Sequence, residues 1–282
     1  MFDRFKRSVD LLKSSATVLK ADRKLLVFPL ISSVAMILVI LCFALPMFGL
    51  GAFDGLHRAR EGSPMLYSAA FLFYVVQYFV IFYFNAALVG CVLARLDGGS
   101  PTVKDGLRMA NARFGTILGY AVINATIGVI LRTIEERVGF LGRFIVGLFG
   151  IAWNMATFLA VPVLVASDVG PVQSVRDSAA LLKRTWGENV AGQVGLGFAF
   201  GMLQLAVALV AAVLIGGVVA LDMPLLALPI ILLAIPAMLA MLLVHSALSA
   251  IYSAVLYRYA SNGDSTIGFD DRALGSAFLP KK

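Results

Sequence analysis

Six long apolar stretches dominate this sequence and limit the folds that it can adopt. A helix needs about 20 consecutive apolar residues to cross the hydrocarbon core of a bilayer. The stretches cover residues 25–50, 66–94, 115–132, 144–166, 190–220 and 224–257. The only charged residue in these six stretches is Arg132, at the end of the third. The sequence therefore predicts an all-α membrane protein, with six transmembrane helices in a single membrane domain (residues 1–257) and a C-terminal tail (residues 258–282).

The composition excludes a water-soluble enzyme built around one core. Apolar residues make up 60% of the chain and charged residues 14%, whereas soluble domains carry about 25% charged residues. Most of the Lys and Arg residues, 18 of 23, lie in four connecting or terminal segments, which are residues 1–24, 95–114, 167–189 and 258–282. Because segments rich in Lys and Arg stay in the cytoplasm, we expect a multi-pass protein of the cytoplasmic (inner) membrane with both termini cytoplasmic.

Two of these segments repeat one another. Residues 102–105 (TVKD) match residues 174–177 (SVRD), and the register continues to an aromatic residue followed by glycine. A Ser or Thr with an acidic residue three positions later is typical of a capping box at the start of a helix. The pattern predicts short cytoplasmic amphipathic helices over residues 102–114 and 174–186, lying at the membrane interface.

Residues 3–20 form a third, weaker copy, with an apolar stripe flanked by basic residues. The fold is then predicted as three parallel repeats, each an interfacial helix followed by a transmembrane hairpin. We expect the second and third interfacial helices to turn into their hairpins at Gly115 and Gly187, since glycine permits a sharp change of direction.

Basic and aromatic side chains on these helices form a predicted lipid interface. A basic amphipathic helix can lie among lipid headgroups, and each Lys or Arg near an anionic leaflet contributes about 1 kcal/mol. The predicted interface residues are Arg4, Lys6, Arg7, Lys13, Lys20, Lys104, Arg108, Phe114, Arg176, Lys183 and Trp186. The expected partners are membrane lipids with anionic headgroups on the cytoplasmic face. Alternatively, these helices only pack over the ends of the bundle.

The polar side chains inside the spans are a second set of candidates. They are Asn85, Asn124, Asn154, Gln193, Gln204 and His245. Such side chains more often join helices by hydrogen bonds than line a pathway. The glycine pairs 115/119 and 197/201 would let helix backbones approach closely, which allows for a protein partner or a homo-oligomer.

Patterns for catalysis and metal binding are missing from the sequence. It contains two histidines, no H-E-x-x-H or G-x-S-x-G motif and no carboxylate within a span, so the common hydrolase and metalloprotease templates do not apply. Cys42 and Cys91 lie in apolar stretches, which favours buried thiols over a disulfide. We predict no catalytic, cofactor-binding or metal-binding residues, no nucleic-acid partner and no enzymatic activity.

The C-terminal region carries a recognisable pattern. Residues 255–260 (VLYRYA) precede residues 268–270 (GFD), and earlier in the chain the basic N-terminal segment leads into residues 27–29 (VFP). In these features the chain resembles a family of uncharacterised prokaryotic six-helix membrane proteins. It is more distantly similar to the membrane domain attached to some glycerophosphodiester phosphodiesterases, in which hydrolysis belongs to a separate soluble barrel. The resemblance implies an architecture and neither an activity nor a site residue.

Two functions remain as predictions. The first is a non-enzymatic, lipid-engaging scaffold or accessory subunit of the cytoplasmic membrane. The alternative is a channel, or a transporter of lipids or small solutes, that works without intramembrane ion-coupling charges. A closed apolar bundle would favour the scaffold, whereas a laterally open cavity lined by Asn and Gln side chains would favour transport.

Overall fold

The computed structural model describes residues 19, 22–49, 64–184, 188–221 and 223–262. Over these ranges the chain is helical and contains no strand. Six segments are long and apolar enough to cross a membrane, namely Arg23–Leu45, Ser68–Leu96, Phe114–Arg137, Phe140–Ala166, Gly195–Ala220 and Ala227–Arg258. The predicted all-α class is confirmed, and so is the presence of six helical segments long and apolar enough to span a membrane.

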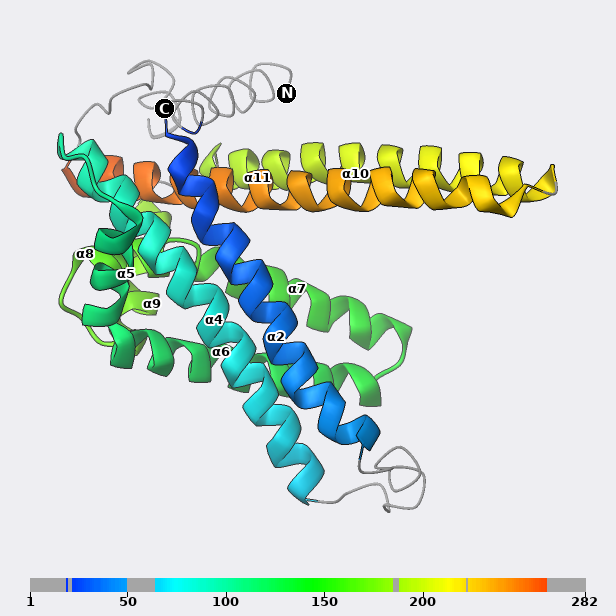
Figure 1. Ribbon diagram of the computed structural model, residues 1–282. Coiled ribbons are helices and arrows are strands. Elements are labelled where there is room, and N and C mark those ends of the chain that lie inside the picture. The colour runs from blue at the N-terminus through cyan, green and yellow to red at the C-terminus, as the bar shows by residue number, and fades with distance from the viewer. Residues whose placement is uncertain (1–18, 20–21, 50–63, 185–187, 222, 263–282) are drawn as a thin grey trace.

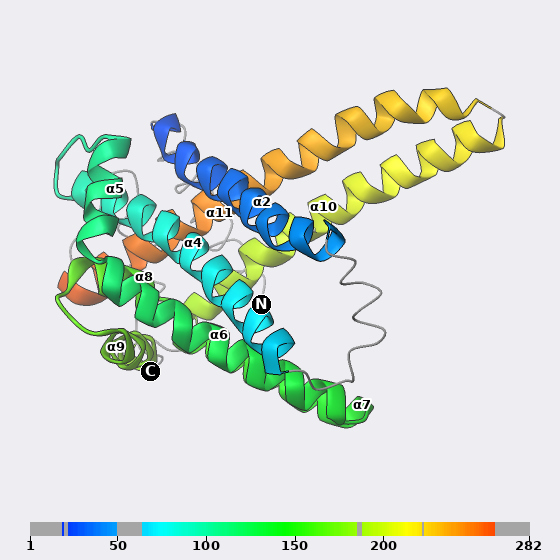
Figure 2. The same cartoon turned by 60° about the horizontal axis from the view of Figure 1, so that its bottom comes forward.

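Three helical hairpins diverge from a common base (Figure 1). The helices are η1 (Arg23–Leu26), α2 (Val27–Gly49), α4 (Pro64–Leu96), α5 (Val103–Ala112), α6 (Phe114–Arg137), α7 (Phe140–Ala156), α8 (Ala160–Ala166), α9 (Pro171–Arg184), α10 (Glu188–Ala220), η2 (Pro224–Leu226) and α11 (Ala227–Asn262). The hairpins are α2–α4, α6–α7 and α10–α11, and the short helices α5, α8 and α9 lie at the base. Toward its tip, α10–α11 stands apart from α6–α7 in both views (Figures 1 and 2).

The packed core lies at this base and not halfway along the hairpins. Large, fully buried side chains come from all three hairpins and include Phe28 of α2, Leu88 of α4, Ile117 of α6, Leu164 of α8 and Ile251 of α11. Toward the tips the apolar side chains of α2, α7, α10 and the first half of α11 are mostly exposed. Because apolar surface of this extent is typical of a membrane-facing region, we assign these faces to the lipid.

The fourth span, predicted as one stretch over residues 144–166, is broken between α7 and α8. Pro162 lacks an N–H, so it could not bond to the carbonyl of Phe158 in a continuous helix. Its ring would also clash with that carbonyl, which lies four residues earlier. Pro162 instead stands in the first turn of α8, where N–H groups have no helical partner. The freed N–H of Leu159 donates to Oγ of the buried Ser178 at 3.0 Å. Helix α9 thereby stabilises the break.

Helix α5 begins with the predicted capping box. The N–H of Asp105 donates to Oγ1 of Thr102 at 3.3 Å, and the N–H of Thr102 donates to the Asp105 carboxylate at 3.0 Å. The predicted turn at Gly115 is wrong, because the chain turns two residues earlier at Arg113 and Gly115 lies inside α6. Arg113 has φ −111° and ψ 16°, which is close to a region that residues other than glycine can adopt.

The predicted capping box at Ser174 is wrong. Helix α9 begins one turn earlier, at Pro171, because the fixed φ of proline suits the first position of a helix. Ser174 is buried within the helix, and its Oγ donates to the carbonyl of Pro171 at 2.7 Å. Asp177, the expected partner in the cap, accepts a hydrogen bond from Nε2 of Gln173 at 2.7 Å.

Candidate functional site

Two cavities between the helices hold four of the predicted intramembrane polar residues. The smaller, of about 330 Å³, is bordered mainly by α4, α6 and α7. It brings together Asn85, Asn124 and Asn154, one from each of these helices. Gln204 of α10 lines neither cavity, and the side chain of Gln193 lies outside the described part of the chain.

Hydrogen bonds occupy the amide of Asn124. Its Oδ1 accepts from Nε1 of Trp153 at 3.0 Å, and its Nδ2 donates to the carbonyl of Tyr120 at 2.8 Å. The first bond joins α6 to α7, and the second lies within α6. Asn124 therefore helps to hold the wall of the smaller cavity together.

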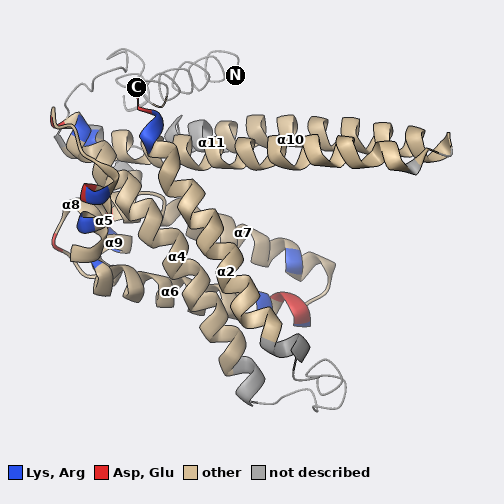
Figure 3. Ribbon diagram, in the orientation of Figure 1, with Lys and Arg blue, Asp and Glu red and all other residues tan. Residues whose placement is uncertain are grey.

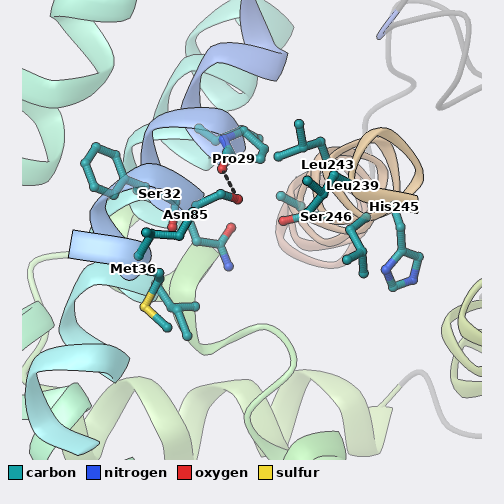
Figure 4. A pocket seen from close by; sticks show the side chains of 15 residues that line it. Pro29, Ser32, Met36, Asn85, Leu239, Leu243, His245 and Ser246 are labelled. Atoms are coloured by element: carbon teal, nitrogen blue, oxygen red, sulfur yellow. Dashed lines mark hydrogen bonds between the residues drawn. The ribbon is translucent and has the colours of Figure 1, made fainter. Parts of the chain in front are cut away.

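The larger cavity, of about 450 Å³, lies between α2, α4 and α11. Ser246 of α11 points across it toward Asn85 of α4 (Figure 4). Most of the other side chains around it are apolar, and four of them are also exposed on the outer surface: Ile37 (57%), Ile81 (40%), Leu239 (52%) and Leu242 (49%). The cavity thus opens sideways between the helices, onto the face that we assign to lipid.

His245 borders the larger cavity, but its ring turns away from Asn85 (Figure 4). The ring centroid lies 5.1 Å from that of Phe200 in α10. His245 therefore packs against α10 within the third hairpin. Ser246, the next residue of α11, supplies the polar group that faces the cavity.

Asn85 is the residue that the two cavities share. Its Oδ1 is buried and has no hydrogen-bond partner among the described residues. A buried acceptor without a partner costs about 1–3 kcal/mol, and an unpaired group of this kind in a folded protein calls for a specific explanation, such as a bound molecule. Sequence reasoning identified Asn85 as polar and intramembrane, but could not single it out from the other amides.

The described residues of the predicted lipid interface lie on helices that also pack against the bundle. Lys104, Arg108 and Arg176 are exposed on α5 and α9. The opposite face of α5 contacts α4 so closely that a Cβ on Gly106 would lie 2.7 Å from the carbonyl oxygen of Ala87. The inner face of α5 therefore packs against the bundle, as in the packing alternative, while Lys104 and Arg108 lie on its exposed face.

Phe114, at the start of α6, is half exposed, and its ring centroid lies 4.9 Å from that of Phe79. The remaining interface predictions lie outside the described residues, as does the predicted turn at Gly187. They are helix 3–20 except for Leu19, with Arg4, Lys6, Arg7, Lys13 and Lys20, the side chain of Lys183, and Trp186.

Charged residues of the described chain gather at the base (Figure 3), and ion pairs there connect the four segments that are rich in Lys and Arg. They join Asp22 to Arg95 at 2.6 Å, Asp97 to Arg258, and Arg113 to Asp168. Each segment contributes at least one partner, so all four meet at the same end of the bundle. The sequence predicted only the excess of Lys and Arg in these segments and did not predict the ion pairs.

Hydrogen bonds from the side chain and the backbone of Thr102 hold the pKa of Asp105 below its ordinary value. A weaker contribution comes from Arg108, whose guanidinium lies 3.0 Å from the carboxylate. Asp105 therefore stays ionised at the start of α5, where a negative charge stabilises a helix.

Within the described ranges no group of three or more His, Cys, Asp or Glu side chains could hold a metal ion. Cys91 is buried and Cys42 is exposed, and both are free thiols. The predicted burial of Cys42 is wrong, because it lies on the part of α2 that extends beyond the packed base.

The fold and the cavities define a multi-pass helical membrane protein with a packed base, splayed hairpins and a laterally open cavity. A family of unknown function, DUF6159, matches residues 65–269, and the chain belongs to this family. No curated protein and no solved structure matches the chain. The predicted membership of an uncharacterised family is confirmed, while the likeness to the phosphodiesterase membrane domain stays a prediction.

Proposed function

We propose that this protein is a non-enzymatic, lipid-engaging protein of the cytoplasmic membrane that takes up a membrane lipid between α2, α4 and α11. The larger cavity is the observation that carries the proposal. It opens sideways, is mostly apolar, and includes Asn85, whose amide oxygen has no partner among the described residues.

The size and position of the cavity support a lipid as its ligand. Small-molecule sites typically have volumes of about 300–1,000 Å³, and this cavity has about 450 Å³. Its half-exposed rim, including Ile37 and Leu242, faces the hydrocarbon of the bilayer in our assignment. Membrane lipids are therefore the molecules with direct access to it, and an acyl chain suits its apolar wall.

An open cavity lined by an asparagine favours lipid binding or movement over a purely structural scaffold. The described residues that line it include no Asp, Glu, Lys or Arg. Ion-driven transporters usually place such groups within the membrane. We therefore propose that lipid enters and leaves this cavity without ion coupling.

We further propose that the base faces the cytoplasm and that the three hairpins are parallel repeats. The ion pairs that join the basic segments at one end support this orientation. Cysteines introduced at the exposed Lys104 and Glu135 test it with a membrane-impermeant maleimide. In intact cells Glu135→Cys should react and Lys104→Cys should not, and the opposite pattern would reverse the topology.

Lipid analysis of the purified protein tests the main proposal. Ser246→Phe places an aromatic ring in the cavity, whereas Ala212→Phe adds the same ring to an exposed position of α10. After purification in mild detergent, mass spectrometry should find less lipid bound to Ser246→Phe than to the wild type and Ala212→Phe. Equal lipid content in all three proteins would count against the cavity as the binding site.

A role as accessory subunit is the second candidate. A Cβ added at Gly197 or Gly201 would meet no atom within 4 Å, so this small-residue face of α10 is open to another helix. Oxidative cross-linking of Gly201→Cys in membranes, with Cys42 and Cys91 replaced by serine, should give a covalent dimer if the partner is a second copy. A monomer under the same conditions would exclude that contact.

A further inference from the structure

We infer that the two cavities form one binding site for an uncharged lipid with a free hydroxyl group, of which diacylglycerol is the simplest example. The larger cavity takes an acyl chain, and the smaller cavity takes the polar end. This inference rests on the proposed function and specifies its ligand.

The two cavities are neighbours because Asn85 belongs to the lining of both. They differ in chemistry. Apolar side chains and three serines dominate the larger cavity. The smaller cavity is lined in large part by polar side chains, which are Tyr78, Asn85, Tyr120, Asn124, Trp153, Asn154 and Thr157. An amphiphile lying across Asn85 would find an apolar environment on one side and hydrogen-bonding groups on the other.

The lining of the site points to an uncharged headgroup. Neither cavity is lined by an Asp, Glu, Lys or Arg among the described residues. A phosphate or a carboxylate placed there would lose its hydration without gaining a counter-charge, which strongly disfavours burial. Hydroxyl, ester and carbonyl groups carry no such penalty, provided that they find hydrogen-bond partners.

The hydrogen-bonding state of the amides selects a hydroxyl group. Asn124 already uses its oxygen for Trp153 and its nitrogen for Tyr120. The oxygen of Asn85 has no donor among the described residues, and a hydroxyl group on the ligand can supply one. Esters, ethers and ketones only accept hydrogen bonds, whereas a hydroxyl group both donates and accepts.

The volume of the smaller cavity limits the size of the polar end. Its roughly 330 Å³ corresponds to the volume of about ten water molecules. That room suits a glycerol unit with one free hydroxyl and part of its ester groups. The ligand class is therefore a neutral lipid with a compact hydroxyl-bearing head.

Photo-crosslinking of the full-length protein in phosphatidylcholine nanodiscs tests this inference. The probe is a diacylglycerol with a photoreactive group on its acyl chain. We expect it to label peptides of α2, α4 or α11. Unlabelled diacylglycerol should compete with the probe, while its acetyl ester, which has no hydroxyl, and phosphatidic acid, which is charged, should not.

Two glycines of α7 provide a matched pair of variants. Gly150 lines the smaller cavity and Gly147 does not, and a Cβ at either position would meet no atom within 4 Å. Gly150→Leu should fill the smaller cavity and remove the part of the labelling that unlabelled diacylglycerol competes away, while Gly147→Leu should behave as the wild type. Asn85→Leu should reduce labelling about 2- to 10-fold through loss of one hydrogen bond, and Gln204→Leu should leave it unchanged.

The outcomes separate this inference from the proposed function. Equal competition by the acetyl ester or phosphatidic acid, or normal diacylglycerol competition in Gly150→Leu, would overturn the assignment of the headgroup. If labelling still disappeared in Ser246→Phe, lipid binding in the larger cavity would stand. Labelling that Ser246→Phe does not reduce would overturn both.

Discussion

Replacement of Gly106 with alanine tests how closely α5 is packed against α4. A Cβ there would lie 2.7 Å from the carbonyl oxygen of Ala87, 2.7 Å from Cζ of Phe28 and 2.6 Å from Sγ of Cys91. The first atom belongs to the backbone of α4, and Phe28 is only 1% exposed, so neither can move without disturbing the core. Overpacking costs about 1–3 kcal/mol, and alanine recovers about 1 kcal/mol of helix propensity. Because two of the three contacts are rigid, we expect a net loss of about 1–2 kcal/mol.

Thermal unfolding of the purified protein in detergent measures this loss. For a chain of this size, 1 kcal/mol corresponds to a change in Tm of about 2–4 °C, so Gly106→Ala should lower Tm by about 2–8 °C. Gly147→Ala is the matched control, because a Cβ there meets no atom within 4 Å, and its Tm should stay the same or rise. A rise in Tm for both variants would refute the close contact between α5 and α4.

Three further predictions concern the base. Ser178→Ala leaves the N–H of Leu159 without its acceptor, so we expect a loss of about 1–3 kcal/mol and faster hydrogen exchange at that amide. Asp22→Asn weakens the partly exposed ion pair with Arg95, and the resulting fall in Tm should shrink as salt is added, since salt screens the wild-type pair. The folded-state pKa of Asp105 lies below its ordinary value. The ionised carboxylate therefore stabilises the folded protein fully above the ordinary pKa, and this stabilisation is lost as the pH falls through the lowered pKa. Hydrogen exchange in α5 should accelerate over that range, and Asp105→Asn should remove this pH dependence.

The sequence by itself determined the features that depend on neighbouring residues. The six spans follow from the summed hydropathy of about 20 consecutive residues, and the structure places a long helical segment close to each predicted stretch, the fourth of them broken between α7 and α8. The capping box of α5 needs only Thr102 and Asp105, three positions apart. The same local rule failed at Ser174, because Pro171 one turn earlier is also a strong start signal. Two local signals competed, and a pattern of four residues could not rank them.

Only the tertiary structure decided where the chain is open and which polar groups lack partners. Asn85 and Asn124 have the same side chain in similar apolar surroundings. The amide of Asn124 has a hydrogen bond at both its oxygen and its nitrogen, whereas the oxygen of Asn85 has no partner among the described residues. The difference arises because Trp153 of α7 reaches Asn124, while α2 and α11 leave space beside Asn85. Such spaces depend on how helices from distant parts of the chain cross and diverge. Hydropathy measures whether a segment enters the membrane, and it carries no information on which side chain of another helix lies opposite.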